Sequence, residues 1–504
     1  MAAAMAATIA LAGCSGSPHT APGVVTFVIE SMPANLDPRV GTDSASERLD
    51  GLMFDSLVQR DAQMNIEPDL AASWEQPDPT TYVFHLRHDV RFQDGRALTS
   101  ADVKYTFDSV LSGAIATPKR GAFSSVGVIE TPDPYTVIFR LNSISTSFLW
   151  DISRPAIGIV PQGAAADFAQ DPIGTGPFRF VSEVQDDNVV LDRNPDYFGG
   201  APQISEVRFR IVPEAIVRAL ELRKGAADIE MSSLTPDMVP VLAQQNGIAV
   251  TEAPGNNYNY IAFNFQNPAR AQRDVRQALA YATDRASIVH YLLRGQARLA
   301  DGLLPPGNWA AAENLQSYPY DPARAEQLLD AAGFPRRAAM GGMRLHLTLK
   351  TSTEEESRLL GEVLREQWRK VGIDLELRAL EFGTLYADIT HGNFDLFTLR
   401  WIGANNDPSI FQYVFESDRT PPAGANRGRY SNPQLDSLLA RARVEPDDDR
   451  RKLLFVQAQQ IIAADVPYIS LWFNENICVH RTRIAGIELS PAGNYDFLST
   501  IQAN

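Results

Sequence analysis

The sequence contains almost no cysteine and lacks the motifs of the common catalytic and metal sites. Only two of its 504 residues are cysteines, which excludes a disulfide scaffold. The chain has no P-loop, no complete G-x-G-x-x-G, no H-E-x-x-H, no paired C-x-x-C and no G-x-S-x-G nucleophile elbow. Its seven histidines are scattered, which argues against a structural zinc site. We therefore expect no catalytic residues, no metal site and no cofactor.

The sequence also lacks an excess of basic residues. Its 45 Lys and Arg are outnumbered by 61 Asp and Glu, which gives a formal net charge of −16. Binding to nucleic acid needs a basic surface that neutralises phosphates, so we expect no nucleic-acid partner. Beyond the first 13 residues there is no run of about 18 apolar residues, so we expect no transmembrane helix in the rest of the chain.

The N-terminal segment is markedly apolar. Residues 1–13 carry no charged side chain and are too short to span a bilayer, which is typical of a secretory signal peptide. Residues 11–14 read LAGC and resemble the lipobox of bacterial lipoproteins, with Cys14 in the last position. Residues 14–23 then form a linker. The resemblance implies that Cys14 is lipidated and becomes the first mature residue. A basic region before the apolar run is missing, so the true start lies upstream or the signal is atypical. The alternative is an alanine-rich terminus with a chance cysteine.

Periodic patterns predict a mixed α/β protein. Apolar residues that alternate or are β-branched predict strands at 24–29, 82–87, 135–141, 343–349, 373–377 and 394–401. Apolar residues of 359–371 fall on one helical face, and Gly372 follows as a C-terminal cap. Thr99 and Asp102 have the spacing of a capping box at a helix start. The order strand, helix, strand, helix, strand over 343–401 predicts βαβ organisation.

A family resemblance rests on short segments that occur in a fixed order. They include Glu67-Pro68-Asp69-Leu70-Ala71 and Tyr430-Ser431-Asn432-Pro433, and the full series covers 54–58, 67–75, 82–87, 90–103, 174–178, 193–197, 275–285, 320–322 and 430–433. With these segments the chain resembles the family 5 extracytoplasmic solute-binding proteins, the dipeptide and oligopeptide binding class of ABC transporters. Each segment alone is weak, but their number and order make the match specific.

The resemblance implies an α/β, bilobal periplasmic-binding-protein fold of type II, in the large peptide-binding class. Lobe I is expected to comprise 24–58, 182–264 and 473–504, with an extra α/β subdomain, 59–181, inserted in it. Lobe II is expected to comprise 265–472.

The implied function is that of a monomeric, lipid-anchored substrate-binding protein of an ABC importer. It would lie in the periplasm or at the outer face of the cytoplasmic membrane, capture peptides or peptide-like solutes between its closing lobes, and deliver them to the permease subunits. Close alternatives are binding proteins for a metal chelate, an opine or an oligosaccharide. An extracytoplasmic hydrolase and a sensor or adhesin without a transporter are the alternatives from other classes.

The candidate ligand site follows the strand expected at 394–401, because open α/β sheets bind ligands beyond the carboxyl ends of their strands. The candidates in and after this strand are Arg400, Trp401, Ile402, Gly403, Asn405, Asn406 and Asp407. Asn257 and Tyr258 are further candidates, because they precede the crossover strand expected at 260–265. Trp401 suits a pocket wall or ordinary core packing. Asn405 and Asn406 suit hydrogen bonds to a ligand or a turn.

The same segment departs from the family pattern at one position. In the dipeptide and oligopeptide members an Asp a few residues after the Trp holds the α-ammonium of the ligand. The corresponding residue here is Ala404, which cannot pair with a cation. Either the ligand lacks a free α-amine, or Asp407 binds the ammonium in place of the missing Asp. Asp407 also suits a helix N-cap, with Pro408 at the first helical position. Nearby arginines suit an acidic ligand or a solvated face, namely Arg400, Arg419, Arg427 and Arg429.

Overall fold

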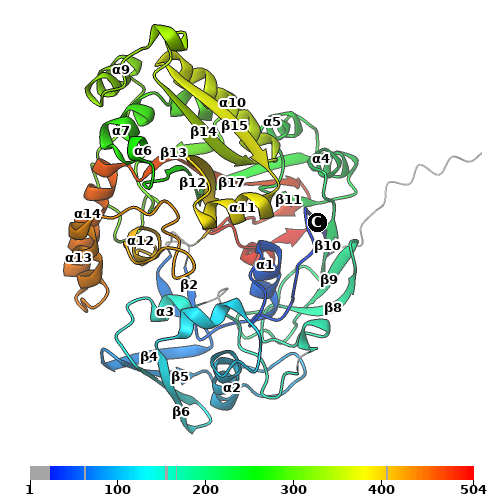
Figure 1. Cartoon of the computed structure of the whole chain (residues 1–504). Helices are drawn as coiled ribbons and strands as arrows, with labels where there is room; N and C mark the ends of the chain where they lie inside the picture. Colours follow the sequence, from blue (N-terminus) through cyan, green and yellow to red (C-terminus); the bar gives the residue numbers. More distant parts are fainter. Residues whose placement is uncertain (1–22, 62–63, 154–156, 166, 404–406) are drawn as a thin grey trace, which may run out of the picture.

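The computed structural model describes residues 23–61, 64–153, 157–165, 167–403 and 407–504. Within these residues an eleven-stranded mixed sheet runs through the molecule in the order β15-β14-β16-β12-β17-β11-β1-β10-β9-β8, with β13 paired to β17 (Figure 1). Its strands are β1 (Val24–Ile29), β8 (Phe178–Val184), β9 (Asn188–Arg193), β10 (Glu206–Ile211), β11 (Ile229–Met231), β12 (Ile248–Phe263), β13 (Ala297–Leu299), β14 (Leu345–Ser352), β15 (Ile373–Leu380), β16 (Leu396–Trp401) and β17 (Tyr468–Arg481).

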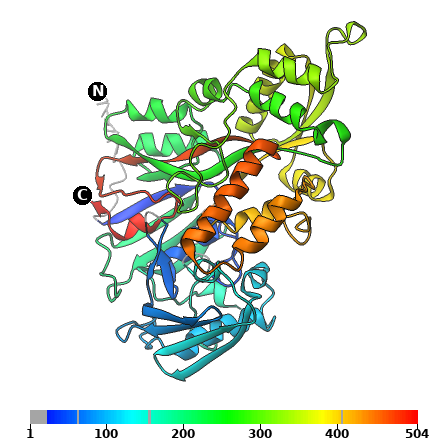
Figure 2. The ribbon, with the colours of Figure 1, turned by 90° about the vertical axis from the view of Figure 1, so that its left-hand side faces the viewer.

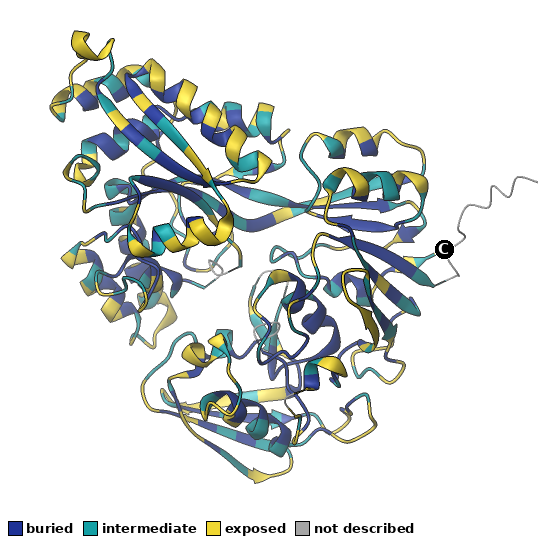
Figure 3. Ribbon diagram, turned by 45° about the vertical axis from the view of Figure 1, so that its right-hand side comes forward, coloured by how far each residue is buried: buried dark blue, intermediate teal, exposed yellow. Residues whose placement is uncertain are grey.

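Two long antiparallel strands, β12 and β17, connect the two lobes. The second half of β12 pairs with β16 of lobe II, whereas the end of β17 pairs with β11 of lobe I. Figure 3 shows these strands as a largely buried band crossing between the lobes. The pairing of β12 with β17 breaks between Pro254 and Tyr258, so the crossing is irregular where the lobes meet.

Lobe II contains the predicted βαβ unit. β14 pairs in parallel with both β15 and β16, and the connections are α10 (Glu355–Lys370) and α11 (Phe382–His391), which confirms the expectation for 343–401. Gly372 follows α10 with a φ of 86°, as a C-terminal cap requires. The other helices are α6 (Pro268–Ala271), α7 (Arg273–Tyr281), α8 (Arg285–Ser287), α9 (Pro322–Ala331), α12 (Ile410–Phe415), α13 (Pro433–Ala442) and α14 (Asp448–Asp465). Figure 2 shows α13 and α14 side by side.

Lobe I combines the β1 side of the sheet with α1 (Ser44–Met53), α4 (Ala215–Lys224) and α5 (Met238–Ala243). A separate four-stranded sheet, β4-β5-β7-β6, lies below it in Figure 1. This sheet packs with α2 around its own aromatic core, in which Phe107 meets Phe139 edge to face. The elements here are β4 (Ala71–Asp78), β5 (Thr81–Leu86), β6 (Val126–Asp133), β7 (Thr136–Leu141), α2 (Ser100–Leu111) and α3 (Phe148–Asp151).

The remaining short strands are β2 (Val58–Arg60), β3 (Ile66–Pro68), β18 (Ile484–Ala485) and β19 (Gln502–Ala503). The capping box is present, since the Thr99 backbone N–H donates to Asp102 Oδ2 at 2.8 Å. Strand β8 crosses the boundary expected between 181 and 182, and all of β8 belongs to the large sheet.

Candidate functional site in a cleft between the lobes

A cleft lies between lobe I and lobe II and has two adjoining compartments. The larger has a volume of about 670 Å³ and the smaller of about 150 Å³. Both are lined from both lobes, and they share Glu30, Ser44, Glu356, Arg400 and Ile402. Because the shared residues lie at the junction, a ligand that occupies both compartments must pass them.

Strand ends and helix starts build the cleft, as expected for an open α/β sheet. Glu30 directly follows β1, and Ser44 opens α1 behind its N-cap Asp43. On the lobe II side, Arg400 and Trp401 end β16, and Glu356 lies in the first turn of α10, just after β14. Glu30, Ser44, Glu356, Arg400 and Trp401 therefore lie in or next to the ends of helices and strands, while the lobes that carry them are joined by β12 and β17.

Aromatic rings and a guanidinium form one wall of the larger compartment. Arg427 lies with its guanidinium carbon 5.1 Å from the Tyr386 ring centroid and 5.4 Å from that of Trp401. Arg427 also donates from Nη2 to the Tyr386 hydroxyl at 3.1 Å. Tyr260 stacks on Trp401, with ring centroids 6.3 Å apart and planes at 12°. The faces of the Tyr386 and Trp401 rings attract cations, and they hold the positively charged Arg427 side chain.

Carboxyl groups line the same two compartments as the arginines. Burial raises the pKa of Glu356, and the nearby positive charge of Arg400 opposes that rise. Burial also raises the pKa of Glu230 on β11, to about 7, against hydrogen bonds from Ser233. The cleft thus offers groups of both signs, which a zwitterionic or mixed-charge solute could pair with.

The structure distributes the predicted site residues unevenly. Arg400 and Ile402 line both compartments, Trp401 lines the larger and Asn257 the smaller. Asp407 lines neither; its Oδ1 accepts the Ser409 N–H at 2.8 Å, and α12 begins at Ile410.

The remaining predicted residues lie outside the two compartments or outside the described residues, apart from two arginines. Gly403 ends the described segment in a left-handed conformation with φ of 70° and does not line either compartment. Ala404, Asn405 and Asn406 lie outside the described residues, as does Cys14. Of the four arginines near this segment, Arg400 and Arg427 line the cleft. Arg419 and Arg429 line neither compartment, and Arg419 pairs with Glu416 at 3.4 Å.

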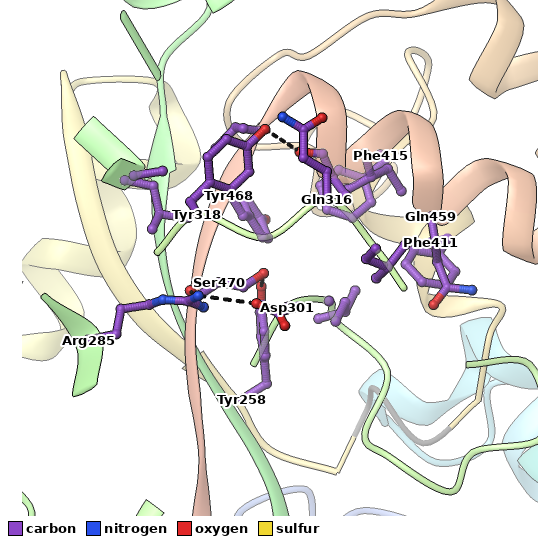
Figure 4. A pocket seen from close by; sticks show the side chains of 18 residues that line it. Tyr258, Arg285, Asp301, Gln316, Tyr318, Phe411, Phe415, Gln459, Tyr468 and Ser470 are labelled. Atoms are coloured by element: carbon purple, nitrogen blue, oxygen red, sulfur yellow. Dashed lines mark hydrogen bonds and ion pairs between the residues drawn. The ribbon is translucent and has the colours of Figure 1, made fainter. Parts of the chain in front are cut away.

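Tyr258 faces a different space. It is almost fully buried and lines, together with residues of lobe II, a separate cavity in which its hydroxyl lies 2.6 Å from Ser470 Oγ. Figure 4 shows Tyr258 and Arg285 on one side of this cavity and Phe411 and Gln459 on the other. The cavity volume of about 40 Å³ has room for one or two water molecules, not for a peptide. Tyr258 therefore contributes to packing and not to ligand binding in the cleft.

Sequence reasoning did not single out several residues that line the cleft, among them Glu30, Glu356, Phe382 and Tyr386. For Glu30 and Glu356 a signal was present, because both follow closely on buried strands whose carboxyl ends face the cleft. Phe382 and Tyr386 lie on α11, and no local pattern marks which of its faces meets the cleft.

The described residues contain neither a metal-binding cluster nor a membrane-spanning helix. No group of three or more His, Cys, Asp or Glu side chains there could hold a metal ion. No helix within the same residues is long and apolar enough to cross a bilayer.

Comparison with known proteins decides the family. The model of bacterial extracellular solute-binding proteins, family 5, matches residues 65–421. The chain belongs to this family. Among curated relatives, di/tripeptide-binding protein 1 of Pseudomonas aeruginosa is 28% identical, covering 94% of this chain and 93% of its own. The dipeptide-binding protein of Escherichia coli is 26% identical to this family 5 protein, covering 94% of this chain and 93% of its own, and both relatives are named as binding proteins.

Solved structures confirm the bilobal α/β fold expected from the sequence. NikA from Brucella suis, in complex with Fe(III)-EDTA, aligns with a TM-score of 0.88 at 24% identity, covering 95% of this chain and 100% of NikA. NikZ from Campylobacter jejuni, in complex with Ni(L-His), aligns with a TM-score of 0.80 at 25% identity, covering 95% of this chain and 99% of NikZ. The cleft described above thus belongs to a family 5 binding-protein fold.

Proposed function

We propose that this family 5 protein is the peptide-binding component of an ABC importer, which captures peptides or peptide-like solutes and delivers them to the permease subunits. The observation that carries the proposal is the cleft of about 670 Å³, lined from both lobes by rings and by charges of both signs. A volume of this size falls in the range of ligand-binding clefts. The name of the Pseudomonas aeruginosa relative supports a peptide as the ligand.

The proposed motion is closure of lobe I (24–58, 182–264 and 473–504, with its insertion 59–181) onto lobe II (265–472). Because the lining groups come from both lobes, a ligand that contacts both walls favours the closed arrangement. In this arrangement Arg400, Trp401, Ile402 and Asn257 are the proposed ligand contacts.

Binding and closure are tested together with the purified mature chain. Calorimetry with di- and tripeptides is expected to show binding, and small-angle scattering is expected to show a smaller radius of gyration with the bound peptide. A variant with Arg400→Gln and Trp401→Leu should lose both effects, whereas the matched variant Arg441→Gln and Trp309→Leu, altered outside the cleft linings, should keep them. Absence of peptide binding by the wild-type chain would contradict the proposed function.

Membrane attachment through Cys14 is a separate part of the proposal. Its support is the apolar run that ends in LAGC and the polar residues that follow. Two or more acyl chains on Cys14 and its amine would give stable anchoring at the outer face of the cytoplasmic membrane, with the binding domain in the extracytoplasmic space. Detergent phase partitioning should place the wild-type protein in the detergent phase and Cys14→Ala in the aqueous phase. Equal partitioning of the two would contradict lipidation.

A second candidate ligand class is a solute that lacks a free α-amine, such as a metal chelate, an opine or an oligosaccharide. The specific observation in its favour is Ala404, which stands where the peptide-binding members have an ammonium-binding Asp. Equal affinity for a peptide and its N-acetyl form would favour this class. A large loss of affinity on acetylation would count against it.

A further inference from the structure

Arg427 differs from the other buried arginines in what surrounds its guanidinium. Its side chain is 8% exposed, yet within the described residues it forms no ion pair and its polar neighbours are tyrosine hydroxyls. A guanidinium is always charged and carries five N–H donors, so tyrosine hydroxyls leave donors unused. Burying a charge without a counter-charge costs several kcal/mol unless another group compensates it.

Other buried arginines of the same chain show what a purely structural guanidinium receives. Arg276 donates to the backbone carbonyls of Asp465, Val466, Arg270 and Ala271. Arg39 forms an ion pair with Asp37 at 2.7 Å. In each of these two guanidinium groups all three nitrogens donate to oxygen acceptors of the protein. Arg427 instead faces the larger compartment of the cleft.

We propose that Arg427, held between the rings of Tyr386 and Trp401, is a subsite for a carboxylate of the bound solute. A carboxylate can accept two parallel N–H bonds from the planar guanidinium fork, and it supplies the missing counter-charge. The rings hold the fork in place before the ligand arrives, which limits the entropy lost on binding. Arg400 lies in the same compartment and adds positive potential at its junction with the smaller one.

This inference rests on the proposed function, because it names the group that the same cleft recognises. The family pattern predicts that the α-ammonium of the ligand is its main point of attachment, whereas this inference makes a carboxylate the main point of attachment. With alanine at position 404, the ligand is held chiefly by its acidic group rather than by an α-ammonium. The carboxylate is either the C-terminus of a peptide or an acidic side chain, since both present the same oxygen pair.

The test compares matched probes by calorimetry on the wild-type chain. The affinities of trialanine and its C-terminal amide differ only through the terminal carboxylate. The affinities of the C-terminal amides of Ala-Glu-Ala and Ala-Gln-Ala differ only through a side-chain carboxylate. We expect one of the two carboxylates to raise affinity about 10- to 100-fold, as a charge-assisted pair of hydrogen bonds does. If the peptide probes bind but neither carboxylate raises their affinity, the subsite is disproved without any variant.

Variants then assign the effect to Arg427. Arg427→Gln should abolish the preference for the carboxylate, and Arg427→Lys should restore part of it, because the charge returns without the planar fork. Arg419→Gln, which alters an arginine already paired with Glu416, should leave the preference unchanged. Thermal unfolding of each variant checks that it is folded. A preference that survives in folded Arg427→Gln would overturn the assignment.

Failure of the proposed function has a different signature. If no peptide probe binds, the solute released from the purified protein by denaturation is methyl-esterified and analysed by mass spectrometry. A released non-peptide solute that carries a carboxylate, and that no longer copurifies with Arg427→Gln, keeps the subsite while rejecting peptide transport. A released solute without a carboxylate overturns the subsite.

Discussion

The guanidinium of Arg427 lies 5.4 Å from the ring centroid of Trp401, although 25 residues and the helix α12 separate them in sequence. This contact joins the end of β16 to the loop before α13, and both residues line the larger compartment of the cleft. The wall that faces a ligand is therefore assembled from segments that only the fold brings together.

The Trp401 ring is expected to contribute directly to ligand affinity. Trp401→Leu removes the cation–π partner of Arg427 and the ring on which Tyr260 stacks, so we expect calorimetry to show affinity lowered by about 2- to 30-fold, equivalent to about 0.5–2 kcal/mol. Trp309→Leu is the control, because Arg451 lies 4.8 Å from that ring outside the cleft lining. Equal losses in the two variants would indicate a general effect on lobe II packing.

The Tyr258 hydroxyl should matter for stability and not for binding. Tyr258→Phe deletes the contact with Ser470 inside lobe II, and we expect urea unfolding to show a loss of about 1–2 kcal/mol with unchanged ligand affinity. Tyr291→Phe, at a side chain 68% exposed, should change neither quantity. Weaker binding by Tyr258→Phe at unchanged stability would instead place this residue in the ligand site.

The buried Glu230 carboxyl should make stability depend on pH. Its pKa is raised from the ordinary 4.5 to about 7, so the folded state keeps a proton that the unfolded state releases. As pH rises from about 4.5 to 7, the wild type should lose stability relative to Glu230→Gln, reaching a difference of about 3 kcal/mol that then stays constant.

Chemical denaturation at a series of pH values measures this difference for Glu230. The exposed Glu252→Gln gives the control curve, which should run parallel to the wild type. A difference between wild type and Glu230→Gln that does not change between pH 4.5 and 7 would contradict the assigned role of burial.

The crossing between the lobes should not tolerate a side chain at Gly255. A Cβ there would lie 2.3 Å from the Asn474 carbonyl oxygen of β17, so the two strands would have to separate. We expect Gly255→Ala to cost about 1–3 kcal/mol in unfolding experiments. Gly121→Ala, at a position with no atom within 4 Å, should be close to neutral, and similar costs for both would refute the close-approach explanation.

The regular parts of the fold were predictable from local pattern. The βαβ unit of lobe II follows from alternation at 343–349 and the helical face of 359–371. The full length of β12 did not follow, because residues 254–257 read as Pro-Gly-Asn-Asn, a turn signal. Pairing with β17, more than 200 residues away, overrides that signal.

The candidate site was predictable where it follows a strand end. Arg400, Trp401 and Ile402 were found by that rule and line the cleft. Tyr258 was chosen because it precedes the strand expected at 260–265, yet its side chain lines a separate cavity beside Ser470, whereas Asn257 and Asn259 line the cleft. The sequence does not show that Arg427 lines the cleft while Arg419 is paired with Glu416, because this depends on burial and on contacts made in the folded chain.

The most direct test of the central proposal is mass spectrometry of the solute that copurifies with the mature protein. We expect native spectra to show one bound solute per chain and the released material to consist of short peptides or peptide-like molecules that carry a carboxylate. Release of only a sugar, or of a metal chelate, would contradict peptide binding by this cleft.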